Sequence, residues 1–262
     1  MNNEPPESIP STPSLVPTTP MPVPTSGDGV PKVLVLFGGT FDPPHTGHVE
    51  LPVRVRDELE RQMECPGGGM VVYIPAARSP HKAHGPLASD ADRVEMLRRA
   101  LSGVERAVVW TDEVDRAAAS AGGAGEASFT VDTITRARDW LVGALGEQAP
   151  KLRLLIGADQ AVNFHKWRAP REILRLAPPV VMVRGELEDS GGLGARMRSS
   201  RFWGRDELDS WRDALLPVGA IHVSATAVRD ALSHKEWDEA GRWLAPGVVE
   251  WIRERGLYQR PE

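Results

Sequence analysis

The stretch GGTFDPPHTGH, which begins at Gly38, holds residue types that suit the binding of an anion. Gly38 and Gly39 directly follow the apolar run KVLVLF. Glycines at the end of a strand let the backbone approach a phosphate and expose its N–H groups. His45 and His48 are three residues apart, so both rings can project from one side of a first helical turn. A helix N-terminus and two imidazoles in one place suit the negative charge that develops on a transferring phosphoryl group.

The same residue types could instead serve a metal or a dinucleotide. His81 and His84 repeat the H-x-x-H spacing, but neither pair contains the glutamate of H-E-x-x-H, and zinc usually takes a third protein ligand. The dinucleotide fingerprint G-x-G-x-x-G and the P-loop G-x-x-x-x-G-K-[ST] are both absent from the glycine turn. We therefore expect a phosphate site without a metal held by protein side chains, with a structural zinc as the alternative.

The segments around this motif alternate between strand and helix patterns. Runs rich in Val, Leu and Ile predict buried strands, and the stretches between them carry apolar residues at helical spacing. This alternation predicts a parallel sheet covered on both faces, so the expected fold class is α/β, doubly wound. In such sheets ligands bind beyond the carboxyl ends of the strands, where the glycine motif lies. The expected strands are 32–37, 70–75, 107–110, 152–157, 179–183 and 220–223, and the expected helices include 90–101, 130–145 and 170–177, with a helical pair near the C-terminus.

Composition and charge narrow the class of protein. The chain has 262 residues, 41% of them hydrophobic, and a formal net charge of −5, which argues against a protein that coats nucleic acid non-specifically. No apolar run approaches the roughly 20 residues of a membrane helix, and the N-terminus lacks the features of a secretory signal. The single cysteine, Cys65, cannot form an intramolecular disulfide. We expect a cytoplasmic protein with neither nucleic acid nor a membrane as its partner, and the sequence makes no prediction of oligomeric state.

The expected organisation is one tail and one domain. Residues 1–31 are rich in Pro, Ser and Thr, and they have too little apolar surface to offset the entropy of ordering, so we predict a disordered tail. Residues 32–262 then form a single domain that ends in a small helical part. Two Gly-, Ser- and charge-rich segments, 115–128 and 184–207, are expected to be loop insertions.

Five motifs give the chain a resemblance to a known family. GGTFDPPHTGH resembles the G-G-[TS]-F-[DN]-P-x-H-x-G-H motif of nucleotidyltransferases with an H-x-G-H site, and it is most like that of the bacterial nicotinate-nucleotide adenylyltransferases. SPHKAHGPLASDADRVEML, SFTVDTI, LIGADQAVNFHKWRAPREIL and HVSATAVRDAL match this family in the same order, over roughly residues 32–257. The resemblance implies a Rossmann-like nucleotidyltransferase fold. It also implies transfer of the adenylyl group of ATP to nicotinate mononucleotide with Mg²⁺ as the cofactor, giving nicotinate adenine dinucleotide and pyrophosphate.

The resemblance also implies which residues bind ATP. His45 and His48 match the two histidines that the family places on the ATP phosphates. Arg229 matches an arginine that stabilises the β- and γ-phosphates and the leaving pyrophosphate, for which a guanidinium fork is suited. The implied ATP-binding set is Gly39, Thr40, Phe41, His45, His48, Gly157, Asp159, Ser224, Thr226 and Arg229, with Gly157 and Asp159 at the adenosine ribose and Ser224 and Thr226 at the start of a helix facing the phosphates.

A second implied group binds the mononucleotide. Thr40 and Phe41 belong to a loop that touches both nucleotides, and Lys82 matches a basic residue near the mononucleotide phosphate. Thr130 matches the region that contacts the nicotinate carboxylate, and Trp167 matches the tryptophan beside the pyridine ring. Simpler roles remain open: Lys82 as a solvated lysine, Thr130 as a helix N-cap and Trp167 as a packing residue. The implied catalytic set is His45, His48, Lys82 and Arg229.

Two positions depart from the pattern of the family. Ala225 stands where the family has a second serine, so one hydroxyl near the phosphates is lost. Pro52 lies inside the expected first helix, where the missing N–H would remove the bond to the His48 carbonyl and bend the helix. Arg93, in a D-x-x-R pattern, can either assist at the site or form a surface ion pair.

Other functions stay open as alternatives. The acceptor could be nicotinamide mononucleotide or another phosphorylated small molecule such as phosphopantetheine. The chain could also be a catalytically silent nucleotide-binding regulator, although such a protein has no need of the full catalytic set. An NAD-dependent oxidoreductase is disfavoured because the dinucleotide fingerprint is absent.

Overall fold

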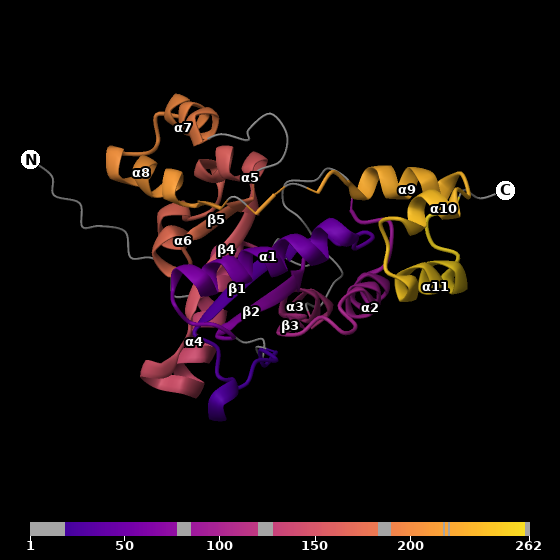
Figure 1. The fold of residues 1–262 in the computed structure, drawn as a ribbon, viewed down its shortest axis with the longest axis horizontal. Helices are drawn as coiled ribbons and strands as arrows, with labels where there is room; N and C mark the ends of the chain where they lie inside the picture. The colour runs from indigo at the N-terminus through magenta and orange to yellow at the C-terminus, as the bar shows by residue number, and fades with distance from the viewer. Residues whose placement is uncertain are drawn as a thin grey trace, which may run out of the picture.

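One parallel sheet of six strands organises the chain (Figure 1). Its strand order is β3-β2-β1-β4-β5-β6, so the order reverses between β1 and β4. This arrangement confirms the doubly wound α/β class. The strands are β1 (Val33–Gly39), β2 (Gly69–Pro75), β3 (Ala107–Val109), β4 (Lys151–Gly157), β5 (Pro179–Met182) and β6 (Leu215–Leu216). The computed structural model describes residues 19–77, 85–119, 128–182, 190–216, 218–219 and 221–259.

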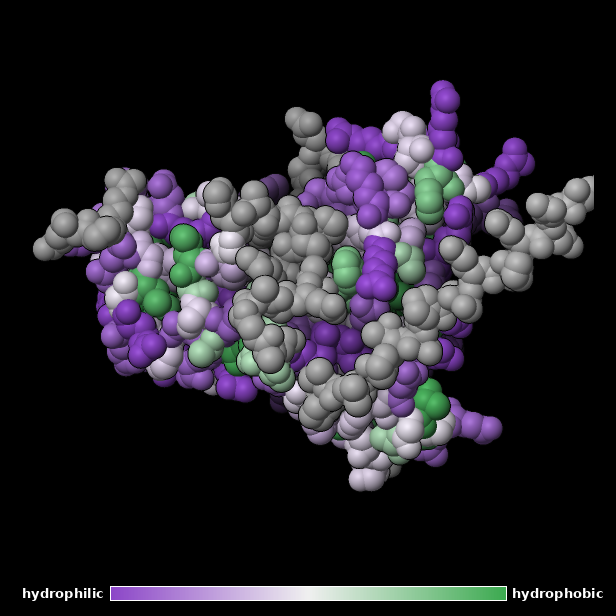
Figure 2. Space-filling view, turned by 180° about the vertical axis from the view of Figure 1, so that it is seen from behind, coloured by the Kyte–Doolittle hydropathy of each residue, from purple (hydrophilic) through white to green (hydrophobic). Residues whose placement is uncertain are grey.

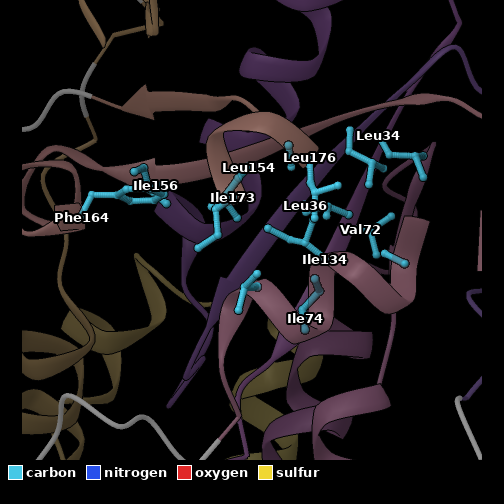
Figure 3. Close-up of a cluster of buried hydrophobic side chains, with 14 of the residues drawn as sticks. Leu34, Leu36, Val72, Ile74, Ile134, Leu154, Ile156, Phe164, Ile173 and Leu176 are labelled. Atoms are coloured by element: carbon cyan, nitrogen blue, oxygen red, sulfur yellow. The ribbon is translucent and has the colours of Figure 1, made fainter. Parts of the chain in front are cut away.

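The central strands are apolar on both faces because helices cover both. Alternate residues of β1 point to opposite sides: Val33 and Val35 meet α1 (Thr46–Gln62), whereas Leu34 and Leu36 belong to the cluster on the other face. That second cluster includes Ile134 of α4 (Thr130–Leu145), Ile173 and Leu176 of α6 (Pro170–Leu176) and Phe164, as Figure 3 shows. The helix after β1 and the helices after β4 therefore lie on opposite faces of the sheet.

The remaining helices extend the layers at both ends of the sheet. The three C-terminal helices lie beside α2 at one end, and their apolar residues Val228, Leu232, Val248 and Ile252 form a separate cluster with Met96 of α2 (Figure 1). The other end carries α7 and α8. The helices not yet given are α2 (Asp90–Ala100), α3 (Asp112–Ala119), α5 (Ala158–Val162), α7 (Ser190–Ser199), α8 (Arg205–Asp213), α9 (Ala225–Ser233), α10 (Trp237–Gly241) and α11 (Pro246–Arg255), and short 3-10 turns span Gly27–Gly29, Gly146–Gln148 and Phe164–Lys166.

The last expected strand is misplaced. The sixth strand is Leu215–Leu216, paired with β5, and the described part of 220–223 is an irregular connection into α9. The amide of Val223 donates to the carbonyl of Ile221, 3.1 Å away. Because this amide is used within a tight turn, it does not form a hydrogen bond to a neighbouring strand. Ile221 and Val223 are apolar because they pack against the clusters around α1 and α2.

The two expected loop insertions are partly helical. Residues 115–119 complete α3, while 120–127 lie outside the described residues. In the second segment, 190–199 form α7, and α8 begins at Arg205. Leu193 and Met197 on α7 are buried in the core, so this segment contributes packing that its Gly- and Ser-rich composition concealed.

The prediction of a disordered tail is wrong for residues 19–31. Met21 and Val23 are 2% and 8% exposed and belong to the core cluster of the α4 face. Trp110 Nε1 donates to the carbonyl of Thr19 at 2.8 Å, so the segment is also held by a hydrogen bond. Two apolar side chains thus anchor to the core a segment whose average composition resembles a disordered one. Residues 1–18 lie outside the described residues.

Helix α1 continues through Pro52 without a break. Pro52 is buried on the helix, and the nearby carbonyl of Val49 accepts a hydrogen bond from Tyr73 Oη at 3.3 Å. A side chain from β2 thus bonds the helix backbone in the turn where proline interrupts the regular ladder.

The surface seen from behind is mostly hydrophilic, with apolar residues in small separate groups (Figure 2). Among the described residues, none of the helices combines the length and the apolar character needed to cross a membrane.

We expect Met21→Ala to lower the free energy of unfolding by about 2–5 kcal/mol, because a buried side chain is lost from the core and a cavity remains. Urea denaturation followed by circular dichroism measures this change. Thr25→Ala in the same segment is the control, because Thr25 is exposed. Equal stability of the two variants would show that the N-terminal segment does not pack on the core.

Candidate active site

The carboxyl ends of β1 and β4 border a cavity of about 470 Å³. Because the strand order reverses between these two strands, the loops that follow them diverge to opposite faces and leave a crevice, which is where ligands bind in doubly wound folds. Seven of the residues expected at the nucleotide site line this cavity: Gly39, Thr40, His48, Thr130, Gly157, Asp159 and Trp167.

The loop between β1 and α1 has a defined shape because of Phe41. Phe41 adopts a left-handed backbone conformation with φ of 50° and is 1% exposed. Its ring packs edge-on against Phe37 and His48, with centroids 5.6 and 5.3 Å apart. A side chain on Gly39 would come within 2.8 Å of the Phe41 ring, so glycine is required for this close approach. Phe41 therefore shapes the wall of the cavity from behind.

The two histidines of the motif lie at the N-terminus of α1. Their rings are stacked with centroids 3.6 Å apart and planes at 20°. The His45 amide donates to His48 Nδ1 at 3.3 Å, so a neutral His48 ring carries its proton on Nε2. His45 is buried, whereas the half-buried His48 lines the cavity. The structure thus brings both predicted histidines together, and His48 faces the cavity.

Helix α9 lies beside the same loop. Ser224 caps it, since its hydroxyl oxygen accepts from the Ala227 amide at 3.1 Å. Arg229 Nη1 donates to the carbonyl of Asp42 at 2.6 Å, and Arg229 Nη2 donates to Thr226 Oγ1 at 3.3 Å. These residues do not line the 470 Å³ cavity, but the Asp42 contact places the Arg229 guanidinium against the histidine-bearing loop.

A buried arginine that the sequence analysis left undecided holds this loop. Arg93 is 0% exposed and forms an ion pair with Asp90 at 2.6 Å. It also donates to the carbonyls of Thr40 and Ala76, at 2.6 and 2.7 Å. The D-x-x-R pattern correctly indicated the ion pair, but the interpretation as a surface pair is wrong. Arg93 fixes the ends of β1 and β2 to α2.

Glu113 of α3 is a cavity residue that the sequence did not reveal. Its carboxylate accepts from Thr133 Oγ1 at 2.7 Å, and burial raises its pKa. The neighbouring Arg116 and Arg136 donate to the fully buried Asp112, at 2.9 and 3.0 Å. Sequence reasoning missed Glu113 because no helix was expected over Asp112–Ala119, and residues from 115 on were predicted to be a loop insertion.

The residues expected at the pyridine ring lie on one wall of the cavity, around Trp167. Its ring is stacked on Phe164, with centroids 4.7 Å apart, and faces the cavity. Thr130 is the first residue of α4, whose N-cap is Phe129, so the alternative role of Thr130 as N-cap is wrong. Arg168 also lines the cavity, with its guanidinium 4.7 Å from the centre of the Phe129 ring. This wall offers an aromatic surface together with a cation.

Two of the sequence-based expectations fall outside the described structure. Lys82, His81 and His84 lie in residues 78–84, which the structure does not describe. Within the described ranges there is no group of three or more His, Cys, Asp or Glu side chains that could hold a metal ion. A Mg²⁺ ion carried by nucleotide phosphates needs no such cage, because this ion keeps much of its water and binds largely through phosphate oxygens.

Comparison with known proteins agrees with this geometry. A model of the family described as Cytidylyltransferase-like matches residues 36–231. The chain is 33% identical over 240 residues to a protein of Laribacter hongkongensis named "Probable nicotinate-nucleotide adenylyltransferase", covering 88% of this chain and 96% of that protein. A protein of the same name from Marinobacter nauticus is 33% identical over 230 residues, covering 86% and 95% of the two chains.

A solved structure extends the comparison to the fold. The Plasmodium falciparum nicotinic acid mononucleotide adenylyltransferase complexed with NaAD superposes with a TM-score of 0.57 over 87% of this chain and 97% of that chain, at 12% identity. Fold and site together define a nucleotidyltransferase of the cytidylyltransferase-like class. Within that class, the chain belongs to the nicotinate-nucleotide adenylyltransferase family.

We expect Gly39→Ala to destabilise the fold by about 1–3 kcal/mol, because the new methyl group must displace the buried Phe41 ring. The adjacent Gly38→Ala is a matched control: a side chain there meets no atom within 4 Å, so stability should change by less than about 1 kcal/mol. Denaturant unfolding of both variants measures the difference. Equal effects would contradict the role assigned to the Phe41 ring.

Proposed function

We propose that the chain transfers the adenylyl group of ATP to nicotinate mononucleotide, giving nicotinate adenine dinucleotide and pyrophosphate. The observation that supports this most is the cavity at the strand reversal, where the glycine loop and His48 face Asp159 and Trp167. The chain carries this site in a sequence 33% identical, over 88% of its length, to a relative named for the activity.

The reaction is a single displacement at phosphorus. An oxygen of the mononucleotide 5′-phosphate forms a bond to the α-phosphorus of ATP. The bond from that phosphorus to the oxygen bridging to the β-phosphate breaks, and pyrophosphate leaves with the electron pair. Because the attacking phosphate is already ionised, no general base is needed, and the protein acts by positioning the reactants and neutralising charge.

On the ATP side, we propose that His45, His48 and the N-terminus of α1 face the phosphates. The proton on Nε2 of a neutral His48 ring suits donation to a phosphate oxygen. Arg229 and the N-terminus of α9, capped by Ser224, would stabilise the β- and γ-phosphates as pyrophosphate leaves. The remaining members of the ATP set are Gly39, Thr40 and Phe41 in the loop, Gly157 and Asp159 at the ribose, and Thr226 on α9.

On the acceptor side, we propose that Trp167 stacks on the pyridine ring and that the start of α4, with Thr130, faces the nicotinate carboxylate. Thr40 and Phe41 would touch both nucleotides, and Lys82 would bind the mononucleotide phosphate. Arg168, which also pairs with Asp132 at 3.5 Å, places a guanidinium on this wall that could donate to an acidic ring substituent.

Mg²⁺ and the cellular location are part of the same proposal. Mg²⁺ bound to the phosphates of ATP would neutralise charge on the transferred and leaving groups. Because ATP is the co-substrate, we propose that the protein works in the cytoplasm.

The test is incubation of the protein with ATP, Mg²⁺ and either nicotinate or nicotinamide mononucleotide, with pyrophosphate release followed and the dinucleotide identified by mass spectrometry. We expect product with nicotinate mononucleotide, formed faster than with the amide. The absence of product with both acceptors would refute the activity, and preference for the amide would refute the assigned acceptor.

His48→Ala should lower kcat/KM by about 10²- to 10³-fold, because it removes a donor aimed at developing phosphate charge. His234→Ala is the control, because His234 is exposed at the far end of α9 and should stay within about twofold of the wild type. Thermal unfolding of both variants checks that the fold persists. Near-normal turnover by His48→Ala would show that His48 does not take part in the reaction.

Trp167→Ala should raise KM for nicotinate mononucleotide about tenfold, because stacking on the pyridine ring is lost, while KM for ATP changes little. Trp167→Phe retains an aromatic face and should recover most of the affinity. Initial-rate kinetics with each substrate varied in turn measure both constants. A rise in KM for ATP alone would place Trp167 at the other nucleotide.

A further inference from the structure

The buried carboxylate of Asp42 joins segments that are far apart in the sequence. Asp42 is 5% exposed and lies in the β1–α1 loop, beside the left-handed Phe41. Its Oδ2 accepts from the Leu87 amide at 2.8 Å, and its Oδ1 accepts from the Ala88 amide at 3.2 Å. The hydroxyl of Tyr258 donates to Oδ1 at 2.6 Å. The C-terminal turn of the chain and the segment that precedes α2 therefore both hold the histidine-bearing loop.

The same residue meets Arg229 through its backbone. The carbonyl oxygen of Asp42 accepts from Arg229 Nη1 at 2.6 Å, so the guanidinium is positioned against the peptide that carries this carboxylate. The hydrogen bonds to the Asp42 side chain therefore restrain the same residue whose carbonyl oxygen orients Arg229. Tyr258 thus binds the carboxylate of Asp42, and Arg229 binds the carbonyl oxygen of the same residue.

The turn after α11 is built to bring Tyr258 back to this point. Gly256 has a φ of 62°, and the Leu257 amide donates to the Ile252 carbonyl at 3.0 Å, which is the pattern of a Schellman helix end. Helix α11 is itself tied to α2 by the ion pair of Arg255 with Asp92, at 3.2 Å. The position of the hydroxyl is therefore set by a rigid helix end.

The chemistry of Tyr258 and Asp42 favours a hydrogen bond between them at neutral pH. The described donors to the Asp42 carboxylate are a phenol and two amides, all of them neutral. A buried carboxylate that loses one of its donors is destabilised, because no water replaces the lost hydrogen bond. Burial, the hydrogen bond to Asp42 and its negative charge raise the pKa of Tyr258, so the hydroxyl keeps its proton at neutral pH.

We propose that Tyr258 is a positioning residue for adenylyl transfer, which acts through Asp42 on the β1–α1 loop and on the Arg229 guanidinium. This inference rests on the proposed function. It assigns to the C-terminal turn a part in orienting groups that bind the leaving pyrophosphate, although Tyr258 itself does not line the cavity between β1 and β4.

Tyr258→Phe tests this role, because it removes the hydroxyl and keeps the ring. We expect kcat to fall about tenfold while KM for nicotinate mononucleotide stays nearly unchanged, since the acceptor wall around Trp167 is untouched. The chain has two tyrosines, and Tyr73→Phe is the matched control: its hydroxyl bonds the Val49 carbonyl instead of Asp42, so kcat should stay within about twofold. A kcat for Tyr258→Phe equal to that of the control would overturn the proposal.

The double variant separates positioning from general loosening of the fold. If Tyr258 acts through Arg229, Tyr258→Phe should lower kcat by a much smaller factor in the Arg229→Lys variant than in the wild type. The proposal would be overturned if the two substitutions lowered kcat by independent factors while KM for nicotinate mononucleotide rose in parallel. That result would show a merely structural role for Tyr258.

Hydrogen–deuterium exchange tests, without an activity assay, whether Tyr258 holds the β1–α1 loop. Tyr258→Phe should speed amide exchange in residues 40–48 relative to Tyr73→Phe, and unchanged exchange there would overturn the proposal. If the wild type makes no dinucleotide, the proposed function fails, and this measurement still decides whether Tyr258 holds the loop.

Discussion

The reversal of strand order between β1 and β4 is the constraint on which the site depends. Chains leaving adjacent parallel strands toward opposite faces cannot close over the sheet edge between them. Here α1 follows β1 on one face, and α5 and α6 follow β4 on the other. The open space receives the glycine loop from one strand and Gly157 and Asp159 from the other, so residues distant in sequence face one cavity.

Beside that space, buried charged groups fix the backbone of the β1–α1 loop. Arg93 neutralises carbonyl dipoles at the ends of β1 and β2, and Asp42 accepts hydrogen bonds from three donors on two further segments. Each group would be costly to bury without its partners, so the native loop geometry is strongly favoured over alternatives. A loop held in one geometry favours catalysis when the donors that it carries need not rearrange as charge develops.

Local sequence was sufficient to predict the features that depend on local chemistry. Val- and Leu-rich runs identified the first five strands, because central parallel strands are buried on both faces. The spacing of His45 and His48 correctly placed both rings on one turn of α1. Three of the ordered motifs also identified residues, among them Gly39, Thr130 and Asp159, that the structure brings around one cavity.

Features that depend on distant contacts could not be read in this way. Residues 19–31 are ordered because Met21 meets a core formed by α4 and β1, which composition alone does not reveal. Ile221 and Val223 pack against two apolar clusters beside the helices, although their run has the composition of a strand. Asp42 and Tyr258 are separated by most of the chain, so only the folded structure shows their contact.

The stereochemistry at the α-phosphorus tests the central claim most directly. ATP carrying a sulfur atom that makes its α-phosphorus chiral would be reacted with nicotinate mononucleotide, and the dinucleotide formed would be analysed for configuration. A single in-line displacement in this crevice predicts a nicotinate adenine dinucleotide with inverted configuration. Retained configuration would reveal a covalent adenylyl-enzyme intermediate and contradict the account, as would the absence of the dinucleotide.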